Sequence, residues 1–173
     1  ALKIEIGSGN GHFLVDVALA NKDINYIGIE LKFARVCKTI SKCIKRNIDN
    51  IRIYYGDAIP FIASNITESS VSEFYYNFPD PCPKRKQFKK RIVTPVFLDN
   101  IYRIMTDDAI FTFVTDHDEY LNWVVYYVEK DKRFENVFDP KIVNHLEGYP
   151  CTLFEKMWRD MGKTIYYYRF KKR

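Results

Sequence analysis

The stretch Leu2–Ala20, LKIEIGSGNGHFLVDVALA, decides the fold. It opens with alternating apolar and polar residues, which is typical of a strand, and from His12 onward its apolar residues have helical spacing. Between the two lie Gly7, Gly9 and Gly11, and glycine allows both a sharp turn and the close approach of a ligand. A strand, a glycine loop and a helix in this order open the nucleotide-binding α/β folds. The G-x-G-x-G spacing differs from the dinucleotide pattern G-x-G-x-x-G and does not identify the nucleotide by itself.

Two acids follow the next two strands of this predicted fold. The segment Asn25–Glu30 indicates a second buried strand that ends in a carboxylate, where it could accept both ribose hydroxyls of an adenosine ligand. The alternative for Glu30 is an exposed acid that starts the next helix. A third strand at Ile51–Tyr55 precedes Asp57, which could lie beside the adenine, cap the following helix, or do both.

The rest of the chain continues this alternation of strands and helices. Further strands are predicted at 71–78, 108–115, 134–138 and 164–170, and further helices at 32–46, 57–62, from Thr94 and Pro95 onward, at 119–129 and at 152–161. We therefore expect a single α/β domain over residues 1–173, built on an open, mostly parallel, seven-stranded sheet with helices on both faces. The last strand is expected to enter antiparallel, as part of a closing hairpin.

The loop after the fourth strand, Asn77–Arg91, has the sequence NFPDPCPKRKQFKKR. Proline fixes φ and removes a hydrogen-bond donor, so Asp80 between two prolines is expected on a stiff turn. Six basic residues follow: Lys84, Arg85, Lys86, Lys89, Lys90 and Arg91. A rigid carboxylate beside a cationic loop predicts a site that binds a polyanion and addresses one group of it. The simpler interpretation is a solvated basic face next to an ordinary turn.

Composition and charge narrow the class of protein. Of the 173 residues, 47% are hydrophobic and 28% are charged, which is typical of a globular chain, and no apolar run is long enough to span a bilayer. The net charge of +5 is clustered in the loop and at the C-terminus, which favours a nucleic-acid partner. The four cysteines have no metal-ligand spacing, so we expect reduced thiols, no metal site and a cytoplasmic location. Because a strand pattern starts at once, we expect an N-terminal segment of the full-length protein to be missing.

Several motifs in order carry a resemblance to a known family. They are EIGSGNG, YIGIE, NFPDPCPKRKQFKKR, the pair Thr115-Asp116 and TLFE at Thr152–Glu155. Together they resemble the bacterial tRNA (guanine-N7-)-methyltransferases, the TrmB family, over nearly the whole chain. The resemblance implies a Rossmann-like class I fold, S-adenosylmethionine as cofactor, and methylation of a guanosine in the tRNA variable loop (position 46). No obligatory protein partner is evident, and either a monomer or a homodimer fits.

The resemblance also implies roles for single residues. Those that match the family's cofactor-binding positions are Glu5, Gly7, Gly9 and Gly11 of the glycine loop, Glu30, Asp57 and Asp80. Asp80 also matches the proposed catalytic position. Those that match substrate-binding positions are Lys84, Asp116, Thr152, Leu153, Phe154 and Glu155. The chain departs from the family where Cys82 replaces the usual tryptophan and where Gln87 and Phe88 stand at positions often held by histidine.

The chemistry of guanine N7 suits a fixed carboxylate. N7 carries an in-plane lone pair and no proton, so attack on a methyl group needs in-line placement more than a general base. Asp80 could orient the guanine edge and stabilise the cationic ring that forms. As carboxylates, Asp116 and Glu155 are better suited to base edges than to phosphates. Their alternatives are a strand-end cap for Asp116, and for Glu155 either a surface helix acid or part of a T-x-x-E capping box with Thr152.

Three other classes remain open at this point. A non-catalytic tRNA-binding module could retain the fold. A methyltransferase acting on an exocyclic amine would carry adjacent prolines and an aromatic residue after the fourth strand, which Asn77–Asp80 lacks. An NAD-dependent oxidoreductase is disfavoured by the glycine spacing and by the basic loop.

Overall fold

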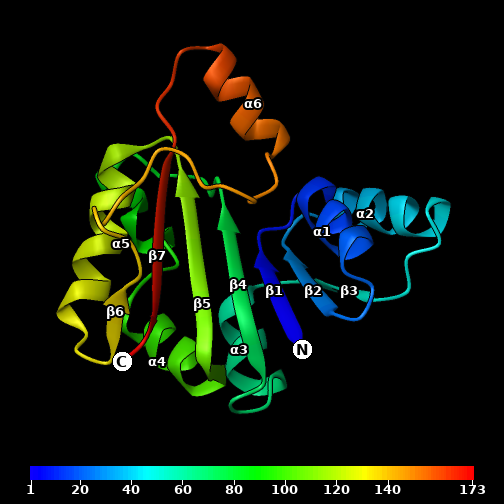
Figure 1. Ribbon diagram of the computed structural model, residues 1–173, viewed down its shortest axis with the longest axis horizontal. Coiled ribbons are helices and arrows are strands. Elements are labelled where there is room, and N and C mark those ends of the chain that lie inside the picture. Colours follow the sequence, from blue (N-terminus) through cyan, green and yellow to red (C-terminus); the bar gives the residue numbers. More distant parts are fainter.

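The computed structural model describes residues 1–173 as one seven-stranded sheet of order β3-β2-β1-β4-β5-β7-β6 (Figure 1). Strands β1 to β5 are mutually parallel, and β7 is antiparallel to both β5 and β6. The expected mostly parallel sheet with an antiparallel last strand is therefore confirmed. The strands are β1 (Leu2–Ile6), β2 (Asn25–Glu30), β3 (Ile51–Tyr55), β4 (Val71–Asn77), β5 (Met105–Thr115), β6 (Phe134–Asn136) and β7 (Tyr166–Lys172).

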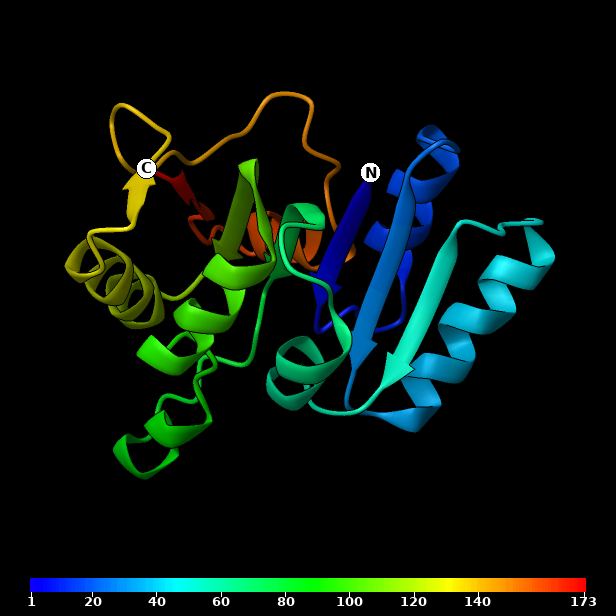
Figure 2. The same cartoon turned by 90° about the horizontal axis from the view of Figure 1, so that it is seen from below.

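Helices cover both faces of the sheet (Figure 2). They are α1 (His12–Ala20), α2 (Phe33–Lys45), α3 (Ala58–Asn65), α4 (Pro95–Ile104), α5 (Asp118–Lys130) and α6 (Leu153–Asp160), with a 3-10 helix η1 (Arg85–Lys90). One face packs α3, α4 and α5 on the sheet in a core of 25 buried residues. The opposite face is smaller, with eight buried residues contributed largely by α1, and Phe13 there meets Tyr75 of β4 edge to face.

Local sequence explains where several helices begin. The hydroxyl of Thr94 accepts from the backbone N–H of Phe97, and Pro95 occupies the first turn of α4, where its missing N–H costs nothing. Thr152 caps α6 in the same way through the N–H of Glu155 at 2.9 Å. Gly162 follows α6 with φ +75°, a conformation that glycine adopts without strain.

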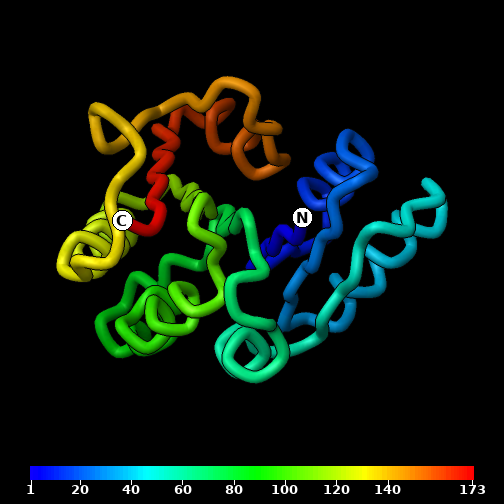
Figure 3. Tube along the Cα trace, turned by 60° about the horizontal axis from the view of Figure 1, so that its bottom comes forward, coloured from blue at the N-terminus to red at the C-terminus, as the bar shows by residue number.

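The parallel strands bring their carboxyl ends to one edge of the sheet, where open α/β sheets bind ligands. Because β1 lies between β2 and β4, the loops after these three strands are neighbours there. Helix α6 stands above this edge (Figure 1). The connecting segment 137–152 reaches it from β6 along the sheet (Figure 3), pairing on the way through Val143 with Tyr167 of β7.

Several predicted boundaries differ from the structure, and the last strand, predicted at 164–170, is Tyr166–Lys172. Strand β5 begins at Met105, not at 108, because Met105 pairs with Val71 before a register irregularity that exposes Asp107 and Asp108. Strand β6 ends at Asn136, two residues earlier than predicted. The basic loop contains η1, which its charge pattern did not indicate.

Candidate active site

The glycine loop after β1 encloses the carboxylate of Glu30. Gly7, Gly9 and Gly11 have φ values of +70°, +57° and +73°, and a Cβ at Gly11 would lie 2.4 Å from Thr39 Cγ2. The backbone N–H of Gly9 donates to Glu30 Oε2 at 2.9 Å, and the N–H of Lys32 donates to Oε1 at 2.8 Å. Glu30 is thus buried at the junction of both loops, and its alternative as an exposed strand-end acid is wrong.

Glu5 is a second buried carboxyl group at this edge, 3% exposed. Its Oε1 accepts from Asn77 Nδ2 at 3.3 Å, while its Oε2 is buried without a partner. Burial raises the pKa of Glu5 to about 8; the hydrogen bond from Asn77 opposes this shift and the charge of Glu30 adds to it. A buried carboxyl with an unpaired oxygen is stabilised by a cationic ligand group that binds against it.

Two further polar atoms of the glycine loop are buried without partners, Ser8 Oγ and Asn10 Oδ1. Buried polar atoms without partners are rare in folded proteins, so a concentration of them around one loop indicates a polar ligand. Together with Glu5 and Glu30, these residues fit a nucleoside that carries hydroxyl and ammonium groups. They form the cofactor side of the candidate site.

Asp57 follows β3 and caps α3, because its Oδ1 accepts from the N–H of Ile59 at 2.9 Å. The capping role expected for it is confirmed. Beside it, Leu31 and the ring pair of Phe33 and Tyr55, with centroids 5.5 Å apart, expose apolar surface between the ends of β2 and β3. A flat aromatic base could cover that surface next to the two acids.

Asp80 lies on a constrained turn after β4. Its Oδ1 accepts from the N–H of Cys82 at 2.9 Å, and Phe78 and Cys82 have φ values of +47° and +46°. Non-glycine residues with positive φ store strain, and such strain concentrates at functional sites. The Asp80 side chain is exposed, so the turn presents one carboxylate oxygen in a fixed place. The Cys82 thiol is buried beneath the turn, and this burial raises its pKa, with the charge of Asp80 adding to the shift.

Arg91 corrects the prediction that all six basic residues of the loop are free for an anion. It is only 2% exposed, and its guanidinium lies over the rings of Phe88, Tyr120 and Trp123 at 4.0, 5.1 and 5.1 Å from their centroids. Its Nε donates to the carbonyl of Pro81 at 3.0 Å, and Nη2 pairs with Glu119 at 3.3 Å. Arg91 therefore fastens the Asp80 turn to α5, and the exposed cations are Lys84, Arg85, Lys86, Lys89 and Lys90.

The positions expected to bind substrate gather around α6. Leu153 and Phe154 are exposed at its first turn, and the ring of Phe154 lies 6.4 Å from that of Phe78, just before the Asp80 turn. Lys163, after α6, pairs with Asp116 at the end of β5 at 2.6 Å. The cap at that strand end is His117, which accepts from the N–H of Tyr120, so a capping role for Asp116 is wrong.

Glu155 is the least expected member of this group. It is 4% exposed, which rules out the surface helix acid. Its Oε1 pairs with Arg159 at 2.9 Å, and its Oε2 is buried without a partner. The backbone half of the capping box is present, because Thr152 accepts from the N–H of Glu155. A buried acid with one free oxygen at this helix start can accept a hydrogen bond from a ligand.

Tyr149 is one of the residues of this region that sequence reasoning missed. Its hydroxyl donates to Asn77 Oδ1 at 2.6 Å, and its ring packs against Phe13 and Tyr167. Nothing in the pattern of the segment 137–152 marks Tyr149, because the residues that it contacts come from distant parts of the chain. Asn77 was predicted only as the start of the loop, whereas in the structure its amide joins Glu5 to Tyr149.

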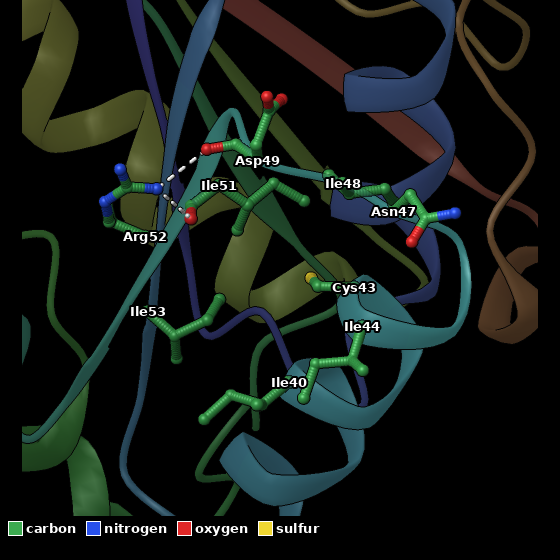
Figure 4. Close-up of a pocket in the computed structure, with 9 residues that line it drawn as sticks. All are labelled: Ile40, Cys43, Ile44, Asn47, Ile48, Asp49, Ile51, Arg52 and Ile53. Carbon is green, nitrogen blue, oxygen red and sulfur yellow. Dashed lines mark hydrogen bonds between the residues drawn. The ribbon is translucent and has the colours of Figure 1, made fainter.

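A separate groove lies away from these residues, at the amino end of the edge strand β3 (Figure 4). It has a volume of about 600 Å³ and lies between β3 and the C-terminal half of α2, where Ile40 and Ile44 are exposed. None of the predicted site residues lines it. The chemistry of the carboxyl edge therefore does not extend into this groove.

The sheet order, the glycine loop after β1 and the acid at the end of β2 define a class I S-adenosylmethionine-dependent methyltransferase. A methyltransferase from Aquifex aeolicus, described as SAM dependent, has this fold with a TM-score of 0.66 at 12% identity, covering 98% of this chain and 80% of that one. A structure described as "a putative methyltransferase from streptococcus mutans in complex with SAH" has a TM-score of 0.65 at 14% identity, covering 100% and 89%.

Comparison of sequences identifies the family within this class. A family described as "Putative methyltransferase" matches residues 1–168. The tRNA (guanine-N(7)-)-methyltransferase of Chlamydia muridarum is 34% identical, covering 98% of this chain and 75% of that protein, and the enzyme of the same name from Rhizobium johnstonii is 31% identical, covering 99% and 74%. The chain belongs to the tRNA (guanine-N7-)-methyltransferase family and spans about three-quarters of the length of these relatives. None of its helices combines the length and the apolar character that crossing a membrane requires.

Proposed function

We propose that this protein transfers the methyl group of S-adenosylmethionine to N7 of a guanosine in the variable loop of tRNA (position 46), and that Asp80 is its catalytic residue. The observation that carries the proposal is the Asp80 turn. It presents an exposed carboxylate at the carboxyl end of β4, next to the buried acids on one side and to five exposed cations on the other. Family membership supports the reaction, and the resemblance of the loop supports the choice of guanosine.

On the cofactor side, each acid takes a distinct part of the ligand. S-adenosylmethionine supplies an electrophilic methyl group on a sulfonium. Glu30, already fixed by two backbone N–H groups, accepts from the ribose hydroxyls, and Gly7, Gly9 and Gly11 let the backbone approach the ligand. Asp57 and Asp80 are further cofactor contacts in this proposal, with the apolar surface of Leu31 and Tyr55 under the adenine. Glu5 accepts from the ammonium group through its unpaired Oε2.

On the guanine side, Asp80 orients and stabilises. Because Oδ1 already accepts from Cys82, Oδ2 is free to accept from the guanine edge. Methylation at N7 leaves a cationic ring, which a fixed carboxylate stabilises more than it stabilises the neutral base. No proton leaves N7, so Asp80 need not act as a base.

The RNA is held by charges on the loop and by α6. Lys84 and its exposed basic neighbours contact phosphates, which positions the tRNA without reading its sequence. Phe154 and Leu153 offer apolar surface for the target nucleotide, close to Phe78. Asp116 and Glu155 accept from base edges, since carboxylates are poor partners for phosphates, and the hydroxyl of Thr152 donates to a base edge.

The proposal is tested by methyl transfer from labelled S-adenosylmethionine to an unmodified tRNA transcript. The matched control transcript has adenosine in place of the variable-loop guanosine. Label that requires this guanosine and gives aniline-sensitive cleavage there is the expected result. Label that persists with adenosine overturns the choice of nucleotide, and no label despite cofactor binding favours a non-catalytic tRNA-binding module.

A further inference from the structure

The hydroxyl of Tyr149 is the outer member of a three-residue hydrogen-bonded chain. Tyr149 donates to Asn77 Oδ1 at 2.6 Å, and Asn77 Nδ2 donates to Glu5 Oε1 at 3.3 Å. The three residues come from separate parts of the sequence: the segment 137–152, the end of β4 and the interior of β1. The chain therefore reaches from the residues just before Thr152 to the buried acid of the cofactor side.

The direction of the hydrogen bonds depends on the ionisation of Glu5. A carboxylate can only accept, so an ionised Glu5 requires the Asn77 amide to present its NH₂ group and Tyr149 to donate to the amide oxygen. A protonated Glu5 could donate to the amide oxygen, which would also allow the flipped amide. Burial holds the pKa of Tyr149 well above its usual value, with the charge of Glu5 adding to the shift, so its hydroxyl remains a donor.

We propose that Tyr149 is a positioning residue, which fixes the Asn77 amide so that it supports the charged form of Glu5 when the cofactor's ammonium group binds. Tyr149 does not touch the cofactor in this scheme and acts only through Asn77. The inference rests on the proposed contact between Glu5 and the cofactor, but not on which nucleotide is methylated.

Few other groups around Glu5 could support its charged form. Glu30 on β2 opposes its ionisation, Asn77 on β4 favours it, and Tyr149 faces it from the segment 137–152. Tyr149 in turn faces Tyr75 of β4 and Arg169 of β7, whose guanidinium lies 5.9 Å from its ring centroid. The Glu5 carboxyl accepts a hydrogen bond from Asn77, and this bond lowers its pKa. The orientation of that amide consequently affects how readily the site accepts a cation.

The position of Tyr149 also ties the cofactor to the substrate side. Three residues after it, Thr152 caps α6, whose first turn carries Leu153 and Phe154. The segment that carries Tyr149 therefore continues directly into the helix of the proposed substrate side.

The test measures binding of S-adenosylhomocysteine, which retains the ammonium group, by calorimetry between pH 6 and 9.5. Tyr149→Phe keeps the ring and its packing and loses only the hydroxyl. It should lower affinity about three- to tenfold near pH 7.5, the range for one hydrogen bond, and move the pH at which affinity levels off upward. Tyr75→Phe, which removes a hydroxyl from the same aromatic cluster, is the matched control and should bind as the wild type does.

Action through Asn77 is tested by a double-mutant cycle. Asn77→Ala should weaken binding, and adding Tyr149→Phe in that background should weaken it no further. Two additive losses, or an unchanged pH profile in Tyr149→Phe, would overturn the proposal in favour of a packing role. Since methyl transfer is not measured, a failed methylation assay would leave this result standing, and normal methylation of the guanosine would not rescue it.

Discussion

The two sides of the carboxyl edge differ in how far their charged groups are exposed to solvent. On the cofactor side, Glu5 and Glu30 are buried, and one oxygen of Glu5 has no partner. On the RNA side, Asp80 and Lys84 are exposed to solvent. The acids of the first side are therefore desolvated before the ligand arrives, whereas Asp80 and the loop cations stay hydrated until RNA docks; on the RNA side only Glu155 is a buried acid.

This difference matches the size of the two ligands. A small cationic cofactor can bind at the glycine loop and pair with the buried acids, which makes its binding sensitive to pH and to hydrogen-bond geometry. A large polyanion meets the surface first, so its binding depends on exposed cations and on salt. The Asp80 turn lies where the two sides meet, and changing it should give the largest effect.

Asp80→Asn should lower turnover about 100- to 1,000-fold, because the amide cannot stabilise the positive ring as a carboxylate does. S-adenosylhomocysteine affinity should change only a few-fold, since Glu5 and Glu30 remain. Single-turnover methyl transfer and calorimetry measure the two quantities. Asp107→Asn, at the exposed start of β5, is the control. Turnover that stays near the wild-type value would rule out Asp80 as the catalytic residue.

Arg91→Met should destabilise the fold by about 3 kcal/mol and also lower turnover, because the Asp80 turn loses the guanidinium that holds the carbonyl of Pro81. Thermal unfolding followed by methyl transfer at a temperature where the variant is folded separates the two effects. Lys90→Ala, the neighbouring exposed cation, should leave the melting temperature unchanged and weaken tRNA binding. Equal behaviour of both variants would mean that Arg91 is a surface cation after all.

Arg91 also shows how far sequence can predict this molecule. The elements and a mostly parallel sheet with an antiparallel last strand were predictable, since strand and helix periodicity is local and Gly7, Gly9 and Gly11 mark the first turn. The inward position of Arg91 was not, because it depends on Tyr120 and Trp123 of a later helix. Charge counting alone treats a buried guanidinium and an exposed lysine as equal. The role proposed for Tyr149 was not predictable either, because it depends wholly on tertiary contacts.

Glu5→Gln should stabilise the cofactor-free protein at high pH. The pKa of Glu5 is raised from 4.5 to about 8 in the folded state, so the folded protein binds the proton more tightly than the unfolded chain. The contribution of Glu5 to the free energy of unfolding is therefore fully present below pH 4.5 and is lost as the pH rises through about 8. At pH 9 the variant should be more stable by about 1–3 kcal/mol, measured by denaturant unfolding, yet bind S-adenosylhomocysteine more weakly. A wild-type protein that is the more stable of the two at pH 9 would contradict a buried, proton-retaining Glu5.

The smallest effect is expected from single exposed cations of the RNA side. Lys84→Ala should reduce tRNA affinity only a few-fold at moderate salt, and it should lower the slope of log affinity against log salt by about one for each phosphate that the loop no longer neutralises. Cofactor affinity should not change, because Lys84 pairs with none of the carboxylates on the cofactor side. Lys22→Ala, an exposed cation in the turn between α1 and β2, is the control and should leave the slope unaltered. If both variants shift the slope equally, tRNA binding depends on the overall charge of the protein, and the basic loop is not its phosphate-binding surface.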